Sequence, residues 1–320
     1  MDWATPSVPN GARGRGLNEY QAFAADGGRR DIGPPRLKRV AFARQQYTVP
    51  KAYIEPNIIN WARRTGWSGD ELRTRLRRRD IDPHFGLHGI YELARGFRSP
   101  SARTDAQRNF QIVAQLDPVY GPTPDMLLDK ELDQLRTGAA VIPTLDAMNH
   151  ASAKYQVARM AEGLFEPEGE EFVREREANI QRDHPKYTAY QLREVRQTIG
   201  AGAHQPTTFE EVVTVLDSEV PSMIRQILGN RATALEAAEL HGRLDRFPAL
   251  RSIVRANLYL WAIPILHDTG ASLDKLDDYR HVVEASYADV FVTGDGQLAR
   301  TVPRIHPGLL VVNWDEVKAG

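Results

Sequence analysis

The sequence contains no cysteine, so disulfide bonds, thiolate zinc sites and a cysteine nucleophile are all excluded. It also lacks an excess of charge of either sign, with 41 Lys and Arg residues against 42 Asp and Glu residues. A nucleic-acid partner would therefore need a local basic patch rather than bulk positive charge. Any bound metal would be held by oxygen atoms and histidines.

An apolar run long enough to cross a membrane is lacking as well. The longest run, from Ile253 to Leu266, is interrupted by Arg255, Asn257 and Pro264 and falls short of the roughly 20 residues that span a bilayer. We therefore expect a core helix here and no membrane partner. No charged segment followed by an apolar one opens the sequence, so a cytoplasmic location is the expectation.

The chain has 320 residues, 42% of them hydrophobic, and can bury a full core. Residues 1–46 are rich in Gly, Pro and Arg without an apolar period, which predicts a flexible arm. Residues 101–270 show an almost wholly helical pattern, whereas short apolar strands are expected in 47–100 and 271–320. The sequence thus predicts an α/β domain with one parallel sheet, split by a long all-helical insertion.

Two of the expected strands are each followed by an acidic residue. Residues 52–54 precede Glu55, and residues 290–293 precede Asp295. Parallel α/β sheets bind their ligands beyond the carboxyl ends of the strands, which favours a chemical role for both acids. The alternative for Asp295 is a plain turn residue, because Asp and Gly are favoured where the chain reverses.

Two further acids lie on expected helices. Glu92 sits beside the apolar residues of a helix over 90–97, and Asp278 opens a helix near the C-terminus. Mg²⁺ and Mn²⁺ prefer oxygen ligands, and converging carboxylates repel one another unless a cation or protons neutralise them. The phase of the last helix leaves Asp277 as an alternative to Asp278, and Asp289 is a reserve ligand that is also a simple turn residue.

Positive charge gathers in one segment. Residues 61–80 carry seven arginines against three acidic residues, and a helix capped by Ser68 presents most of the arginines. Arg73, Arg77 and Arg78 are candidate contacts to the phosphate groups of a nucleic acid. The alternative is a solvated helix face without a partner.

A histidine pattern follows this segment. His84, His88 and Glu92 recur at a spacing of four residues, which would suit a metal site if one helix carried all three. Pro83 and the glycines among them argue against a continuous helix.

Considered together, these segments resemble the PIN-domain nucleases. YIEPNIINW is similar to that family's opening strand with its acid-x-Asn signature, although the family usually has Asp where this chain has Glu55. IYELARGF resembles its second acidic helix, and DYRHVVEA resembles the helix that carries the third acid. ADVFVTGDGQL is similar to the strand end that carries the fourth acid in a T-x-D pattern. The resemblance covers residues 47–99 and 272–317 and does not extend to the insertion.

The resemblance implies a Rossmann-like, three-layer parallel sheet and metal-dependent hydrolysis of RNA phosphodiester bonds. Glu92, Asp278 and Asp295 would hold Mg²⁺ or Mn²⁺, and Glu55 would bridge the ions or orient water.

Three further residues would support this site. Asn57 and Thr293 would fix the carboxylates by hydrogen bonds, the alternatives being a helix cap and an ordinary strand residue. His281 lies one turn beyond Asp278 and would face the same side, either contacting substrate or simply packing.

The departure at Glu55 keeps a second function open, that of a catalytically inactive PIN-like module that binds RNA or a protein. A nuclease acting on single-stranded DNA would use the same metal site. RNA is the expected partner, and an inhibitory or regulatory protein and a homo-oligomer stay open.

Overall fold

The computed structural model describes residues 49–178, 206–267 and 273–319. In these residues one sheet of five parallel strands has the order β3-β2-β1-β4-β5. The arm expected at 1–46 and the segment 179–205 of the expected insertion lie outside the described residues. The strands are β1 (Lys51–Ile54), β2 (Asp82–Gly86), β3 (Val119–Gly121), β4 (Val290–Thr293) and β5 (Leu310–Asn313).

Helices pack on both faces of this sheet, and the two faces follow from the alternation of side chains along a strand. Ala52 and Ile54 of β1 face one core, whereas Tyr53 between them faces the other. The helices of the first core are α1 (Pro56–Thr65), α2 (Gly69–Arg77), α3 (Leu87–Ala94), α4 (Arg103–Leu116), α6 (Ala147–Ala161) and α14 (Trp314–Ala319). The helices of the second are α11 (Pro248–His267), α12 (Leu273–Glu284) and α13 (Gly296–Ile305). The predicted α/β class with a parallel sheet is confirmed.

The direction of the chain reverses at the centre of the sheet. From β1 the chain passes outward through β2 to β3, and it then returns to place β4 and β5 on the other side of β1. All five carboxyl ends point to the same edge because every pairing is parallel. The ends of β1 and β4 therefore form a topological switch point, where open α/β sheets bind their ligands.

Two strands lie where none was expected. β2 contains Pro83, which pairs with Ala52 although it has no backbone N–H to donate, and its short run DPHFG has no strand-like alternation. β3 has only three residues and lies inside 101–270, the segment expected to be all helical. The expectation of helices alone was wrong there, because so short a strand leaves no periodic signal.

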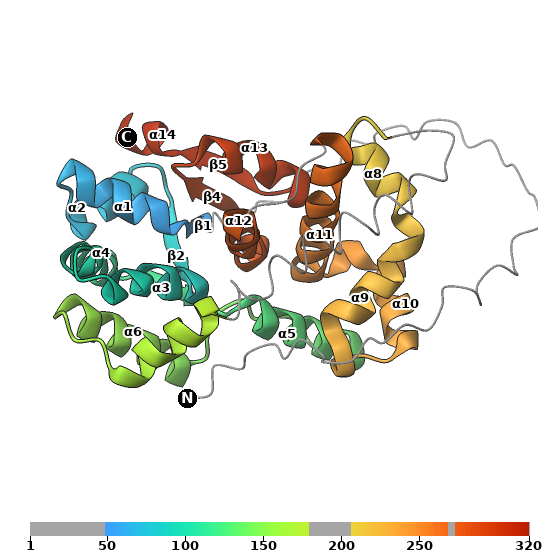
Figure 1. Cartoon of the computed structure of the whole chain (residues 1–320), viewed down its shortest axis with the longest axis horizontal. Coiled ribbons are helices and arrows are strands. Elements are labelled where there is room, and N and C mark those ends of the chain that lie inside the picture. Colours follow the sequence, from blue (N-terminus) through green and yellow to red (C-terminus); the bar gives the residue numbers. More distant parts are fainter. Residues whose placement is uncertain (1–48, 179–205, 268–272, 320) are drawn as a thin grey trace, which may run out of the picture. The chain divides into compact units, whose positions relative to one another are not determined.

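A separate group of helices builds its own apolar core. This core is formed by α5 (Pro124–Thr137), α8 (Phe209–Val215), α9 (Val220–Leu228), α10 (Ala234–Gly242) and one side of α11. The other side of α11 packs on the sheet layer through Ala256 and Leu260. Helix α11 thus links the two cores (Figure 1).

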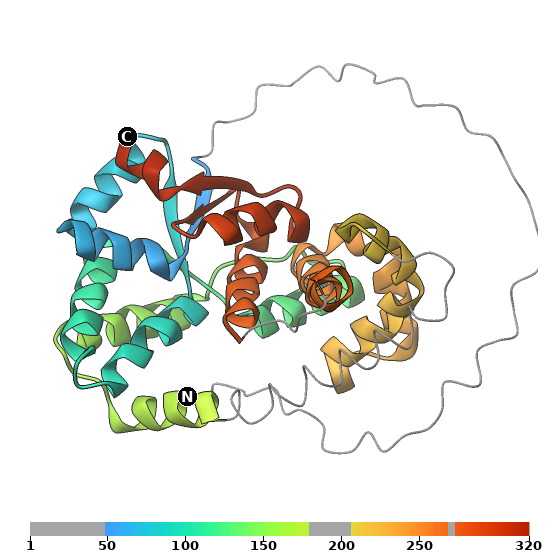
Figure 2. The same cartoon turned by 45° about the horizontal axis from the view of Figure 1, so that its top comes forward.

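The expected core helix at residues 253–266 is this helix α11. Within the described ranges, α11 and every other helix are too short or too polar to span a lipid bilayer. The domain boundaries expected at 100 and 271 stay predictions. The sheet with its helical layers and the separate core of α5 and α8 to α11 both belong to one compact unit, residues 48–320 (Figure 2).

Candidate metal centre

Two of the predicted acids lie side by side at the switch point. Glu55 directly follows β1, and its backbone N–H donates to the carbonyl oxygen of Val292 on β4 at 3.1 Å. Asp295 follows the end of β4 by two residues. Pro56 at the first position of α1 turns the chain away immediately after Glu55, since its fixed φ suits a helix start. The buried Glu55 carboxylate is left at the strand ends.

The residues predicted to support the acids do connect these two strand ends. The Thr293 hydroxyl donates to Oε2 of Glu55 and accepts the backbone N–H of Asp295 at 2.9 Å. Oδ1 of Asn57 accepts the backbone N–H of Gly294 at 3.0 Å. Asn57 therefore holds the β4 end rather than a carboxylate, and it does not cap α1, whose N-cap position is Glu55.

Asp295 caps a helix. It is the N-cap of α13, where its Oδ1 accepts the backbone N–H groups of Gln297 at 2.6 Å and Leu298 at 2.9 Å. The local role of Asp295 is therefore that of a helix cap in extended conformation rather than of a turn residue. The second carboxylate oxygen, Oδ2, makes neither of these bonds, so capping does not prevent Asp295 from contributing an oxygen to a cation.

Glu92 reaches the site from α3 and meets His281 of α12. Oε2 of Glu92 lies 2.7 Å from Nε2 of His281. The other ring nitrogen, Nδ1, lies 2.7 Å from the hydroxyl of Tyr53, which itself donates to Oε2 of Glu284 at 2.7 Å. Since Tyr53 gives its proton to Glu284, both ring nitrogens of His281 act as donors. A hydrogen-bonded chain thus runs from Glu92 to Glu284 beneath the switch point.

The charges along this chain are set by burial and by pairing. Burial of His281 favours the neutral ring, but the hydrogen bond to Glu92 and the nearby carboxylates outweigh it and raise the pKa to about 9. Burial opposes ionisation of Glu92, yet the bond to His281 holds the pKa of that carboxyl below its usual value. Burial raises the pKa of Glu284 to about 7. His281 is therefore an imidazolium that neutralises part of the acidic cluster.

The four predicted acids influence one another. Burial is the main cause that raises the pKa of Glu55 to about 8, and the charges of Glu92 and Asp278 add to it. Burial likewise raises the pKa of Asp278 to about 6, with a contribution from the charge of Asp295. These shifts place Glu55 within electrostatic range of Glu92 and Asp278, and Asp278 within range of Asp295, although the acids come from different segments.

The structure distinguishes Asp278 from the two alternative ligands, Asp277 and Asp289. Asp277 lies 3.5 Å from Nε2 of His88 and forms ion pairs with Arg95 and Arg280, so its carboxylate is engaged by these basic side chains. Asp289 accepts the backbone N–H of Lys51 at 2.9 Å. Because Lys51 is the first residue of β1, Asp289 lies at the amino-terminal edge of the sheet, and the reserve role considered for it was wrong.

The arginines proposed to bind phosphate occupy a different part of the molecule. Arg73 donates to the carbonyl oxygen of Leu116 at 2.8 and 2.6 Å and so ties α2 to α4. Arg77 and Arg78 are exposed at the end of α2, a few residues before β2 begins. They lie toward the amino-terminal edge of the sheet, opposite the acids, so a substrate contact by either stays a prediction that the fold does not favour.

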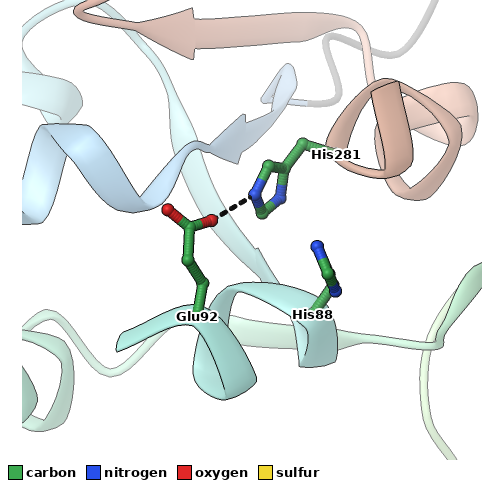
Figure 3. A group of neighbouring side chains, drawn as sticks. All are labelled: His88, Glu92 and His281. Atoms are coloured by element: carbon green, nitrogen blue, oxygen red, sulfur yellow. Dashed lines mark hydrogen bonds and ion pairs between the residues drawn. The ribbon is translucent and has the colours of Figure 1, made fainter. Parts of the chain in front are cut away.

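The histidine pattern is resolved differently from the one-helix arrangement considered. His84 lies on β2, whereas His88 and Glu92 lie one turn apart on α3. His281 takes the place of His84, and ligand atoms of His88, Glu92 and His281 all lie within 4.8 Å of one another (Figure 3). Burial lowers the pKa of His88 to about 3, so this ring is neutral.

Several residues of the site carry no sequence signal that identifies them. Tyr53 looks like an ordinary strand residue, and Glu284 falls in the apolar run VVEA. One signal was available: Gly86 ends β2, and a Cβ atom there would lie 1.9 Å from Oε2 of Glu284. That glycine indicates that a side chain fills the space beside it, but not which one.

The fold and the site were also compared with known proteins. No protein-family model, curated protein or solved structure matches this chain.

Proposed function

We propose that this protein is a metal-dependent endoribonuclease with a PIN-like, Rossmann-type fold, hydrolysing RNA phosphodiester bonds with Mg²⁺ or Mn²⁺. The observation that carries the proposal is that Glu55 and Asp295 lie at the switch point of a parallel sheet, with Glu92 and Asp278 within electrostatic range of Glu55. Acids brought together from distant segments oppose one another's charge, and a cation bound between them would relieve that repulsion.

The donor set fits a hard divalent ion. Carboxylate oxygens are the ligands that Mg²⁺ and Mn²⁺ prefer, and Asp278 and Asp295 would hold the ion together with Glu92 and Glu55. When bound, such an ion lowers the pKa of a coordinated water and stabilises charge on phosphoryl oxygens. Thr293 orients the Glu55 carboxylate, and Asn57 fixes the backbone before Asp295, so the ligands are held in place before substrate arrives.

A second function is favoured by a specific observation. The acids are already partly neutralised within the protein, since Thr293 binds Glu55 and the His281 imidazolium binds Glu92. An inactive PIN-like module, which binds RNA or a protein without cleaving it, would look the same. The two functions differ in metal binding, which only the nuclease requires.

Metal dependence is the direct test. We expect the full chain to cleave single-stranded RNA with Mn²⁺ and not with EDTA, and to bind Mn²⁺ saturably in calorimetry. Asp278→Asn should reduce cleavage at least a hundredfold, because it removes a charged ligand. Asp315→Asn, at an exposed acid that pairs with Lys318, is the matched control and should retain activity.

Each result of this test has a clear consequence. Absence of Mn²⁺ binding would rule out the nuclease and favour the inactive module that binds RNA or a protein. Cleavage of single-stranded DNA without cleavage of single-stranded RNA, measured side by side, would reassign the substrate to DNA.

An exposed tryptophan beside the acids suits a single-stranded substrate. Trp61 on α1 is 39% exposed, and its ring lies against Gly294, where an added Cβ would sit 2.6 Å from the ring. Gly294 immediately precedes Asp295. The guanidinium of Arg64 lies 5.6 Å from the ring centre. An exposed ring and a cation at the rim of the site could stack on an unpaired base and contact its phosphate.

Trp61→Ala is expected to raise KM for single-stranded RNA about tenfold with little change in kcat, since one base stack contributes on the order of 1.4 kcal/mol. Mn²⁺ affinity, measured by calorimetry, should not change. Trp61→Phe keeps an aromatic face and should recover most of the loss. An unchanged KM in the alanine variant would remove Trp61 from the substrate path.

With this function we propose a cytoplasmic location and RNA as the partner. An inhibitory or regulatory protein and self-association are further partners that the proposal leaves open. The separate helical core, built on α5 and α8 to α11, is the part of the described chain that could select the substrate or bind such a protein.

A further inference from the structure

A second group of potential metal ligands lies beside the four acids. His88 and Glu92 project from α3, and His281 projects from α12 to meet them (Figure 3). One ligand atom from each lies within 4.8 Å of the other two. A tetrahedral ion with ligand bonds of about 2.1 Å needs its ligand atoms about 3.4 Å apart, so side-chain movements of about 1 Å would close the group around it.

His88 is the residue that points to a ligand. Its side chain is 2% exposed, and Nε2 is buried without a hydrogen bond. The nearest acid oxygen, Oδ1 of Asp277, lies 3.5 Å away. A buried ring nitrogen with so long a polar contact is poorly satisfied, which costs free energy, and a metal ion that accepts its lone pair would recover that cost.

The two histidines are held in place by one buried carboxylate. Oε1 of Glu284 accepts the backbone N–H of His88 at 2.9 Å, and Oε2 accepts the Tyr53 hydroxyl that contacts Nδ1 of His281. Metal-binding histidines usually donate their second N–H to such a partner, which fixes the ring and its tautomer. His281 would keep its Nδ1 proton for Tyr53 and release its Nε2 proton to solvent when the ion binds.

We propose that His88, Glu92 and His281 form a second metal site, specific for a borderline transition ion such as Zn²⁺. Two imidazoles and one carboxylate favour Zn²⁺ over Mg²⁺, whose preferred ligands are all oxygens. Glu92 belongs to both groups, with Oε2 turned to His281. The Zn²⁺ site does not depend on nuclease activity, because its ligands are sufficient without Asp278 or Asp295.

Calorimetric titration of the full, chelator-treated chain with Zn²⁺ tests the site. We expect one equivalent to bind, and His88→Gln to weaken that binding at least a hundredfold. The matched control is His84→Gln, which changes a partly buried histidine one strand away and should leave the affinity unchanged. Equal Zn²⁺ affinity in His88→Gln and the wild type would overturn the proposal.

Two further measurements keep the test decisive. Asp295→Asn should keep its Zn²⁺ affinity while losing Mn²⁺ binding, which separates failure of this site from failure of the nuclease. If His88→Gln does not fold, X-ray absorption of the Zn²⁺-loaded wild type replaces it. Scattering from two imidazoles per ion is the expected result, and a spectrum with fewer than two would refute the site.

Discussion

Asp295→Asn is expected to lower Mn²⁺-dependent RNA cleavage about a thousandfold, the upper range for loss of one charged group at a reacting centre. Asparagine keeps the side-chain oxygen that caps α13 through the N–H groups of Gln297 and Leu298. It is also as good an N-cap as aspartate, so the melting temperature should stay almost unchanged. The variant therefore removes charge without removing structure.

A second readout distinguishes loss of a ligand from general damage. The charge of Asp295 contributes to raising the pKa of Asp278, so the pKa of Asp278 should fall in Asp295→Asn, as NMR titration can show. Asp295→Ala is the contrasting variant, because it also loses the cap and should cost about 1 kcal/mol of stability. Cleavage by Asp295→Asn at the wild-type rate would rule out the proposed metal centre.

The sequence was informative where one local pattern determines the structure. The run at residues 290–293 is continuous and apolar, as expected for a strand buried on both faces, and β4 has those bounds. Ser68 caps α2 as its position before the charged helix predicted, accepting the backbone N–H of Glu71. The acids at the ends of β1 and β4 could be predicted because parallel strands place their carboxyl ends together.

The sequence was silent where partners are distant. The Tyr53 hydroxyl meets His281 and Glu284 across separations of 228 and 231 residues, and no local pattern links such positions. The charge state of an acidic side chain also depends on how deeply the fold buries it. Glu55 was expected to bridge the ions or orient water, whereas burial raises its pKa to about 8. A bound cation would reverse that shift, so Glu55 would lose its proton when the metal binds.

Helix α11 gives a structural reason for the separate helical core of α5 and α8 to α11 to affect the site. Helix α12 carries Asp278 and His281, and it packs against α11, which belongs to both cores. The buried carboxylate of Glu131 on α5 forms a joint between the two cores. It accepts the backbone N–H groups of Ala249 and Leu250 and the hydroxyl of Tyr287, each at 2.7 Å. One side chain thus caps α11 and holds the segment that follows α12.

Glu131→Ala is accordingly the substitution expected to destabilise the fold most. It leaves two buried backbone donors and the partly buried Tyr287 hydroxyl without an acceptor, and the loss should be about 3 kcal/mol near pH 5, or roughly 10 °C in melting temperature. Glu131→Gln keeps one oxygen acceptor but turns an amide toward a backbone N–H, so its loss should be smaller. Calorimetric unfolding of both variants against the wild type measures the difference. A melting temperature unchanged in Glu131→Ala would mean that the joint does not stabilise the fold.

The pH dependence of this loss follows from the pKa of Glu131. Burial is the largest influence and raises the pKa to about 7 from 4.5, although the three hydrogen bonds oppose it. Between these values the folded protein binds more protons than the unfolded chain, so this group's contribution to stability falls as the pH rises from about 4.5 to about 7. Glu131→Gln cannot titrate. The stability of the wild type relative to Glu131→Gln should therefore decrease by up to about 3 kcal/mol over that window. A difference that stays constant over that window would show that the carboxylate is ionised throughout, with the α11 N-terminus stabilising its charge.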